Sequence, residues 1–191
     1  MALDDPHQLG DWLHGGPARF APGAALTLVV SDVADTEAEI ILRPQILAVG
    51  IGCERGAEAE EVAALLNHVL CSAGLSSLSL ACLASIDAKM DEPALRAVAG
   101  RFGLPLRFFD AVRLERETPR LANPSDAVFR AVGCHGVAEA AALACAEATG
   151  IGIAATFTVT GTGAEAGAAL AAGLLAQERA HQPQARAEQP G

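Results

Sequence analysis

The sequence predicts an α/β fold: a three-layer-like, mainly parallel or mixed sheet with flanking helices, in a single main domain. Strand and helix patterns alternate between residues 46 and 160, which is the order expected for parallel strands joined by helical crossovers. Ile46 to Ile51 is a continuous apolar run, as expected for a strand that is buried on both faces. Hydrophobic residues make up 51% of the chain and aromatic residues only 4%, so we expect a core of small aliphatic side chains.

Apolar periodicity and β-branched content predict the elements of this domain. After the strand Ile46–Ile51, helical spacing predicts helices over 57–73, 92–102, 123–132 and 137–148. Strand patterns fall at 78–85, 106–109 and 151–160. Gly74 and Gly103 are predicted to end the first two helices, and Asp91 and Asn123 to cap the second and third. Residues 111–122 are charged and predicted to be irregular.

The chain is predicted to have three parts: an N-terminal arm over 1–45, the main domain over 46–162, and a C-terminal part over 163–191. The arm has strand-like segments at Leu26–Val30 and Glu39–Leu42 but too few apolar positions for a core of its own. In the C-terminal part we expect an Ala/Gly-rich helix over Ala164–Ala176, followed by a disordered tail.

Charge and cysteine content exclude several classes of protein. With 13 basic and 23 acidic residues the net charge is −10, which argues against binding to nucleic acid. No apolar run approaches the roughly 18 residues that a membrane span requires. The cysteines are odd in number and form no CxxC pair, so we expect free thiols in a reducing cytoplasm. Cys71, Cys82 and Cys145 are predicted to lie in the core. The histidines lack metal-ligand spacing, and no metal site is predicted.

Two loops are the candidate ligand sites, because α/β sheets bind ligands beyond the carboxyl ends of their strands. The first runs from Gly52 to Gly56. Its glycines allow a ligand to approach the backbone, the following helix start favours an anion, and Arg55 can bind a carboxylate. Cys53 lies near the helix start, where a thiol pKa falls, but a packed structural role is favoured for it. The loop can equally be a tight turn that needs glycine only for its geometry.

The second loop runs from Ser85 to Glu92. Asp87 and Glu92 are candidate acid–base groups, while Ser85 and Lys89 are candidate substrate contacts. An ordinary solvated loop with a helix cap would have the same composition. Asn123 and Ser125 are further candidate contacts, although a helix start explains both.

Five segments, in this order, carry a resemblance to a known family. They are VGIGCERG (49–56), LASIDAKMDEPAL (83–95), LPLRFFD (104–110), NPSDAV (123–128) and VAEAAAL (137–143). Over about residues 44–160 the chain resembles the C-terminal domain of the cobalamin-biosynthesis proteins CbiG and CobE. The arm is similar to the end of the CbiG central region.

This resemblance implies a role in building the corrin ring of cobalamin. CbiG is the cobalt-precorrin-5A hydrolase, which opens a lactone and releases acetaldehyde. The implied ligand is a tetrapyrrole corrinoid, with cobalt only as part of the substrate and no other cofactor. Other cobalamin-biosynthesis enzymes are implied partners, and a homodimer is left open. Two alternatives also stay open: a non-catalytic corrinoid-binding or carrier module, and a structural partner of a separate CbiG portion.

The chain departs from the family pattern at two places. The family has a lysine after its last helix, and Gly150 to Thr158 contains none. The turn before VAEAAAL commonly carries Pro-Ser, and here it carries His135-Gly136. If the lysine contacts substrate in the family, its absence puts substrate binding or turnover by this chain in doubt.

Overall fold

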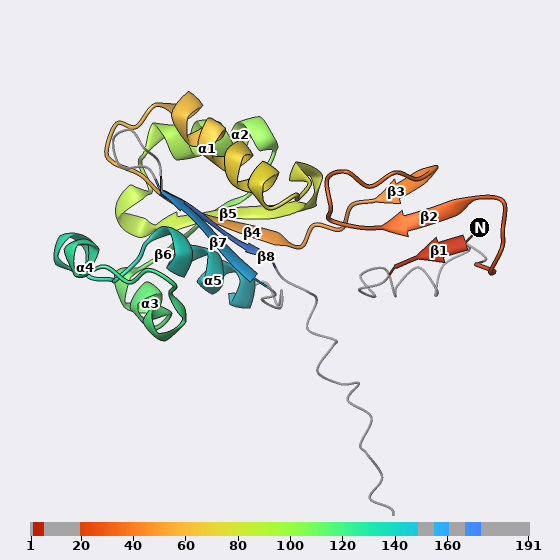
Figure 1. The fold of residues 1–191 in the computed structure, drawn as a ribbon. Coiled ribbons are helices and arrows are strands. Elements are labelled where there is room, and N and C mark those ends of the chain that lie inside the picture. The colour runs from red at the N-terminus through yellow and green to blue at the C-terminus, as the bar shows by residue number, and fades with distance from the viewer. Residues whose placement is uncertain (1, 6–19, 149–154, 161–166, 173–191) are drawn as a thin grey trace, which may run out of the picture.

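The computed structural model describes residues 2–5, 20–148, 155–160 and 167–172 (Figure 1). The main sheet has the strand order β6-β5-β4-β8-β7. Its strands are β4 (Leu47–Gly52), β5 (Leu80–Ile86), β6 (Leu106–Phe109), β7 (Ala155–Thr160) and β8 (Gly167–Ala172). β4, β5 and β6 pair in parallel, whereas β8 is antiparallel to both β4 and β7. The predicted α/β fold with a mixed sheet is therefore confirmed.

Helices cover both faces of this sheet (Figure 1). On one face lie α1 (Ala59–Ser72) and α2 (Pro93–Phe102), which pack with β4 and β5 into one apolar cluster. On the other face lie α3 (Ala111–Glu115) and α5 (Ala138–Ala148), which form a second cluster with the same strands. α4 (Asp126–Val132) precedes α5. The result is the expected helix–sheet–helix layering.

Close approach between α5 and β4 depends on Gly50. A Cβ atom added at Gly50 would lie 1.8 Å from the carbonyl oxygen of Ala138 and 2.6 Å from the amide nitrogen of Ala142. The backbones of strand and helix are therefore in direct contact, which no residue with a side chain permits. Consistent with this, residues 140–146 of α5 are all buried, and most of them are alanine.

The predicted helix over Ala164–Ala176 is wrong where the structure describes it, because residues 167–172 form strand β8. Alanine and glycine there pair through their backbones with β4 on one side and β7 on the other. Helix propensity is a weak preference that tertiary context overrides, and here it competes with the open edge of a central strand. The predicted strand over 151–160 is confirmed at Ala155–Thr160, and its first four positions lie outside the described residues.

Three further sequence predictions are wrong. The predicted irregular segment 111–122 contains α3 and the short 3-10 helix Thr118–Arg120. Neither Asp91 nor Asn123 is an N-cap, since α2 starts after Glu92 and α4 after Ser125.

The cysteine prediction is confirmed at two of three positions. Cys82 on β5 and Cys145 on α5 are buried, with their sulfur atoms 2.6 Å apart across the interface between sheet and helix. Cys71 is exposed on α1, because it lies on the face of that helix opposite the buried stripe that includes Leu66 and Leu70. The apolar run around Cys71 therefore identified the helix but not the orientation of this residue.

The arm forms a small parallel sheet with the order β1-β2-β3. The predicted strands are confirmed as β2 (Thr27–Val30) and β3 (Ile40–Leu42), and β1 (Ala2–Asp4) was not predicted. Val30 is fully buried in the core cluster that contains α1, so the arm shares the core of the main domain. No helix in the described parts of the chain is both long and apolar enough to cross a membrane.

Candidate functional site

The two candidate loops meet beyond the carboxyl ends of β4 and β5, as their positions in the sequence predict. The amide of Gly56 donates a hydrogen bond to the carboxylate of Glu92, with a nitrogen–oxygen distance of 3.1 Å. Gly56 has φ +74, a conformation that L side chains rarely adopt. This glycine therefore turns the first loop so that its backbone faces the second.

Several of the predicted site residues are occupied by contacts within the protein. Ser85 is fully buried, and its hydroxyl donates to the carbonyl of Ile51 at 2.7 Å. Glu92 is 7% exposed and holds the Gly56 amide. Ser85 connects strand β5 to β4, and Glu92 connects the second loop to the first, so the first role of both residues is to fix the shape of this edge.

The charged residues of the two loops that face solvent include Arg55 and three carboxylates, Glu54, Asp87 and Asp91, all of which are exposed. Asp87 begins the short 3-10 helix Asp87–Lys89, and Lys89 itself is half-buried. Arg55 has no hydrogen bond or ion pair with any residue that the structure describes, and so its guanidinium is available to an anion.

Cys53 lies beside Lys89 and Glu92, half-buried at the start of the first loop. Burial raises the pKa of the Cys53 thiol above its ordinary value; the positive charge of Lys89 lowers it, and the negative charge of Glu92 raises it further. The expectation that the helix start would lower this pKa is therefore wrong. A protonated thiol at neutral pH fits the packed structural role that the sequence favours.

The two loops form two walls of the site, and the turn between α4 and α5 forms the third. Gly133, with φ +81, ends α4, and the carbonyl of His135 accepts a hydrogen bond from the amide of Ser125 at 2.8 Å. A Cβ atom added at Gly52 would lie 3.5 Å from the Cβ atom of Val137, so this turn packs against the first loop. The start of α5 therefore reaches the same edge as the two loops.

The remaining predicted contacts, Asn123 and Ser125, belong to this third wall. Ser125 is the N-cap of α4, and its hydroxyl accepts a long hydrogen bond from the amide of Val128 at 3.4 Å. Asn123 is exposed two residues earlier. The helix start that the sequence alternative describes is therefore present, but its N-cap is Ser125, two residues after the predicted Asn123.

His135 is a functional candidate that the sequence reasoning missed. Its Nδ1 lies 2.9 and 3.0 Å from the two carboxylate oxygens of Glu115, and its amide donates to Glu115 Oε2 at 3.0 Å. Its Nε2 lies 3.5 Å from Asp126, and its ring stacks on Phe129 with 4.5 Å between centroids. The sequence signal was a histidine in the break before a helix, at a position where the family carries a different residue.

The contacts of Glu115 keep this carboxylate ionised. Partial desolvation raises the pKa of Glu115, but hydrogen bonds from the amide and from the ring of His135 lower it below the ordinary value. An ionised Glu115 accepts the Nδ1 proton of His135 and so leaves Nε2 as the basic nitrogen. This is the arrangement by which a carboxylate orients a histidine for proton transfer.

Comparison with known proteins shows which family contains the residues of this site. A family model, cobalamin synthesis G C-terminus, matches residues 47–172. The chain is 53% identical over 97 residues to protein CobE of a Sinorhizobium species, which covers 51% of this chain and 63% of that protein. It is 33% identical over 128 residues to the cobalt-precorrin-5A hydrolase of Priestia megaterium, covering 64% of this chain and 34% of that protein.

A solved structure agrees with both sequence matches. The crystal structure of CobE, a protein from the cobalamin (vitamin B12) biosynthetic pathway, superposes with a TM-score of 0.60 at 43% identity. That match covers 68% of this chain and 91% of the CobE chain. The chain spans less than two thirds of the length of either curated relative, but the matched residues 47–172 include all three walls of the site. The chain therefore belongs to the cobalamin synthesis G C-terminus family and is a cobalamin-biosynthesis protein related to CobE.

Proposed function

We propose that this chain binds a corrinoid intermediate at the carboxyl edge of its sheet and opens the lactone of cobalt-precorrin-5A by hydrolysis. The observation that carries the proposal is the His135–Glu115 pair in the turn that packs against the Gly52–Gly56 loop. It supplies a carboxylate-oriented base at the edge where a sheet of this kind binds ligands. The relative named cobalt-precorrin-5A hydrolase makes lactone opening the first reaction to test.

The proposed step uses one water molecule and needs no redox partner. Water attacks the acyl carbon of the lactone, and His135 Nε2 takes a proton from that water. The acyl carbon–oxygen bond then breaks, the alkoxide that leaves takes up the proton, and the new carboxylic acid releases its own proton to water. Acetaldehyde leaves in a second step: the alcohol loses its O–H proton, its carbon–carbon bond to the ring breaks, and the ring carbon keeps the electron pair and takes up a proton. Backbone amides of the Gly52–Gly56 loop are the donors available to the oxyanion.

Charged residues at the same edge would bind the substrate's own carboxylates. Arg55 is exposed without a partner among the described residues, and Lys89 is half-buried in the second loop, where its charge acts on Cys53 of the first. The chain's net charge of −10 repels an anion at long range, so such a ligand needs these local cations. Asp87, exposed at the start of the second loop, remains a second candidate to activate water, whereas Glu92 is held by the Gly56 amide.

The test is incubation with cobalt-precorrin-5A, with acetaldehyde and the absorption spectrum of the corrinoid as readouts. The variant His135→Gln should lower turnover by roughly a hundredfold or more, which is the usual contribution of a general base. The matched control is His68→Gln, which changes an exposed histidine on α1. Equal turnover in His135→Gln and the unchanged chain would exclude His135 as the base, and no turnover in any form would exclude the hydrolase.

A non-catalytic corrinoid-binding module is the second candidate. It is favoured by the internal contacts of Ser85 and Glu92, which leave fewer free acid–base groups at the edge than the sequence suggests. The same incubation separates the two functions. A corrinoid that stays bound without release of acetaldehyde supports the binding module and contradicts the hydrolase.

A further inference from the structure

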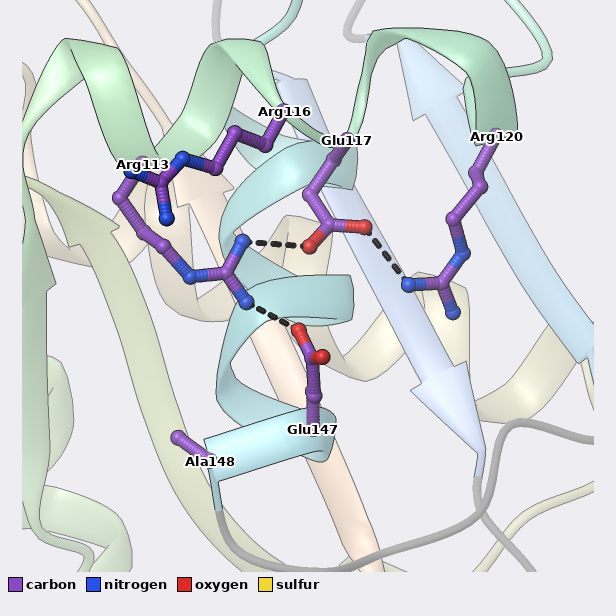
Figure 2. A pocket seen from close by; sticks show the side chains of 6 residues that line it. All are labelled: Arg113, Arg116, Glu117, Arg120, Glu147 and Ala148. Carbon is purple, nitrogen blue, oxygen red and sulfur yellow. Dashed lines mark hydrogen bonds and ion pairs between the residues drawn. The ribbon is translucent and has the colours of Figure 1, made fainter.

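A cavity lies away from the loop edge, between α3, the 3-10 helix Thr118–Arg120 and the end of α5 (Figure 2). Its volume is about 470 Å³. Its lining is mostly charged and consists of Arg113, Arg116, Glu117, Arg120, Glu147 and Ala148. Since the chain has only 13 basic residues, the gathering of three arginines around one cavity requires an explanation.

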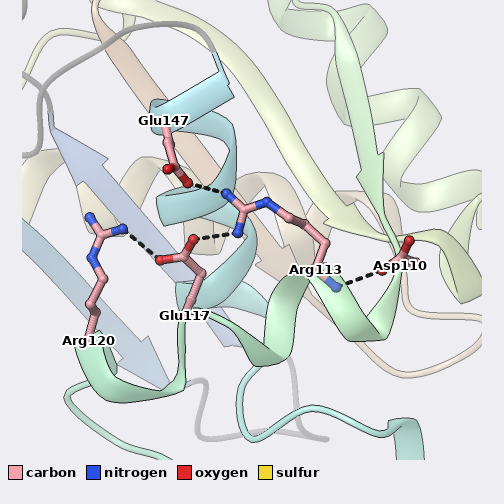
Figure 3. A network of polar contacts seen from close by, with 5 residues as sticks. All are labelled: Asp110, Arg113, Glu117, Arg120 and Glu147. Carbon is pink, nitrogen blue, oxygen red and sulfur yellow. Dashed lines mark hydrogen bonds and ion pairs between the residues drawn. The ribbon is translucent and has the colours of Figure 1, made fainter.

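Glu117 holds two of the arginines that line this cavity. Its side chain is 3% exposed, and each of its carboxylate oxygens accepts from a different arginine, at 2.5 Å from Arg113 and 2.7 Å from Arg120. Arg113 uses its other terminal nitrogen on Glu147 (Figure 3). A buried carboxylate must be paired, and here the pairing also holds two guanidinium groups at fixed positions around the cavity.

Asp110 holds the backbone of Arg113 in the same network. Its carboxylate accepts from the backbone amide of Arg113 at 2.6 Å and so caps the first turn of α3 (Figure 3). The side chain of Arg113 is 25% exposed, and the contacts of its guanidinium with Glu117 raise its pKa. Arg113 is therefore a permanent, immobilised cation in the wall of the cavity.

Ion pairing explains Arg113 but leaves Arg116 and part of Arg120 without a structural role. Arg116 lines the cavity, yet it makes no hydrogen bond or ion pair within the ranges that the structure describes. Arg120 is 43% exposed and uses one of its donors on Glu117. Three guanidinium groups face two carboxylates, so the lining carries one positive charge in excess although the whole chain is strongly acidic.

We propose that this cavity binds a carboxylate group of the chain's ligand, with Arg116 as its main partner. The planar guanidinium of Arg116 donates two parallel hydrogen bonds to the carboxylate, and the remaining donors of Arg120 contribute to the same anion. Glu117 positions the wall and does not contact the ligand. The identity of the ligand rests on the proposed function: it is a peripheral carboxylate of the corrinoid, bound apart from the reacting lactone.

The experiment compares two corrinoids by calorimetric titration of the full chain. One is cobyrinic acid, whose side chains are free carboxylates, and the other is cobinamide, whose side chains are amides. Arg116→Gln should weaken cobyrinic acid binding by roughly tenfold or more, as expected for a lost charge-assisted pair, and leave cobinamide binding unchanged. Arg116→Lys should recover part of the loss, because lysine keeps the charge without the bidentate geometry.

The matched control is Arg101→Gln, which removes the same charge from α2 on the opposite face of the sheet. It should leave both affinities unchanged. If Arg116→Gln and Arg101→Gln bind cobyrinic acid as tightly as the unchanged chain, the cavity proposal is overturned while corrinoid binding stands. If both variants weaken it equally, the effect is one of net charge and the proposal is again overturned.

A third experiment tests the cavity if no corrinoid binds and the proposed function fails. Propane-1,2,3-tricarboxylate is then titrated into ¹⁵N-labelled protein, with the Nε–Hε signals of the arginines as the readout. Selective shifts of the Arg116 and Arg120 signals support a carboxylate site that is independent of corrinoids. Absence of such shifts, or equal shifts at Arg101, overturns the cavity proposal as well.

Discussion

His135 and Glu115 show how single residues acquire a function only through their surroundings. The two residues are 20 positions apart in the sequence, and His135 holds Glu115 through both its ring and its backbone amide. As a lone histidine without metal-ligand spacing, His135 does not stand out as a ligand, and its only sequence signal is its place in the break before a helix. Its importance depends on the turn after Gly133, which presents the ring to α3 and the backbone to α4.

Glu115 should make the protein sensitive to acid. Because the folded pKa of Glu115 lies below its unfolded value, Glu115 contributes stability above the ordinary glutamate pKa of about 4.3, and this is lost as pH falls through the folded pKa. Glu115→Gln should therefore be less stable than the unchanged chain at pH 7, with a difference that shrinks below about pH 4. Urea denaturation at a series of pH values measures this, and a difference that is independent of pH would contradict it.

Cys53 should react slowly with alkylating agents despite its place at a loop. Burial raises the pKa of its thiol, so little of the reactive thiolate is present at neutral pH. We expect iodoacetamide at pH 7.5 to modify the exposed Cys71 well before Cys53, as measured by mass spectrometry of the digested protein. Faster modification of Cys53 than of Cys71 would restore the case for a nucleophilic cysteine at this edge.

The contact between β4 and α5 is possible only because Gly50 has no side chain. Gly50→Ala would place a methyl group 1.8 Å from the carbonyl oxygen of Ala138, which is backbone and cannot move aside cheaply. We expect a loss of roughly 3 kcal/mol or more in the free energy of unfolding, the upper range for overpacking a core. Urea denaturation monitored by circular dichroism measures the change.

The control for this prediction is Gly100→Ala on α2. Gly100 is exposed, and a Cβ atom added there meets nothing within 4 Å. Alanine should stabilise the helix by roughly 0.5–1 kcal/mol, because glycine is a poor helix former. Equal effects of the two substitutions would mean that backbone entropy, and not the helix–strand contact, determines the role of Gly50.

Element prediction succeeded where the signal is local. α1 and α2 follow from apolar spacing, and Gly103 ends α2 in the left-handed conformation that glycine favours. The N-cap prediction for α2 failed because of a contact that is not local. Glu92 precedes α2 but turns its carboxylate to Gly56, 36 positions away, so it makes no cap within its own helix.

At the scale of the whole molecule, the hairpin of β7 and β8 closes one side of the sheet. Without it, β4 would be an edge strand, and six backbone positions that now pair with β8 would be open. A chain ending at Ala148 lacks both strands, so we expect it to lose cooperative thermal unfolding and to aggregate. Differential scanning calorimetry and light scattering measure these effects, and an unchanged transition would mean that β4 to β6 fold without the hairpin.

The sequence by itself determined the α/β class, the strands β4, β5 and β6, the helices α1, α2 and α5, and the edge at which the loops Gly52–Gly56 and Ser85–Glu92 lie. These follow from periodicity and from glycine positions, which act over neighbouring residues. Only the tertiary structure decided three other matters: strand β8 in place of a helix, the His135–Glu115 pair, and the arginine cavity around Glu117. The first two depend on contacts between segments distant in the chain, whose energies outweigh local preference and leave no periodic trace in the sequence. The cavity combines two local ion pairs of Glu117 with the contact between Arg113 and the distant Glu147.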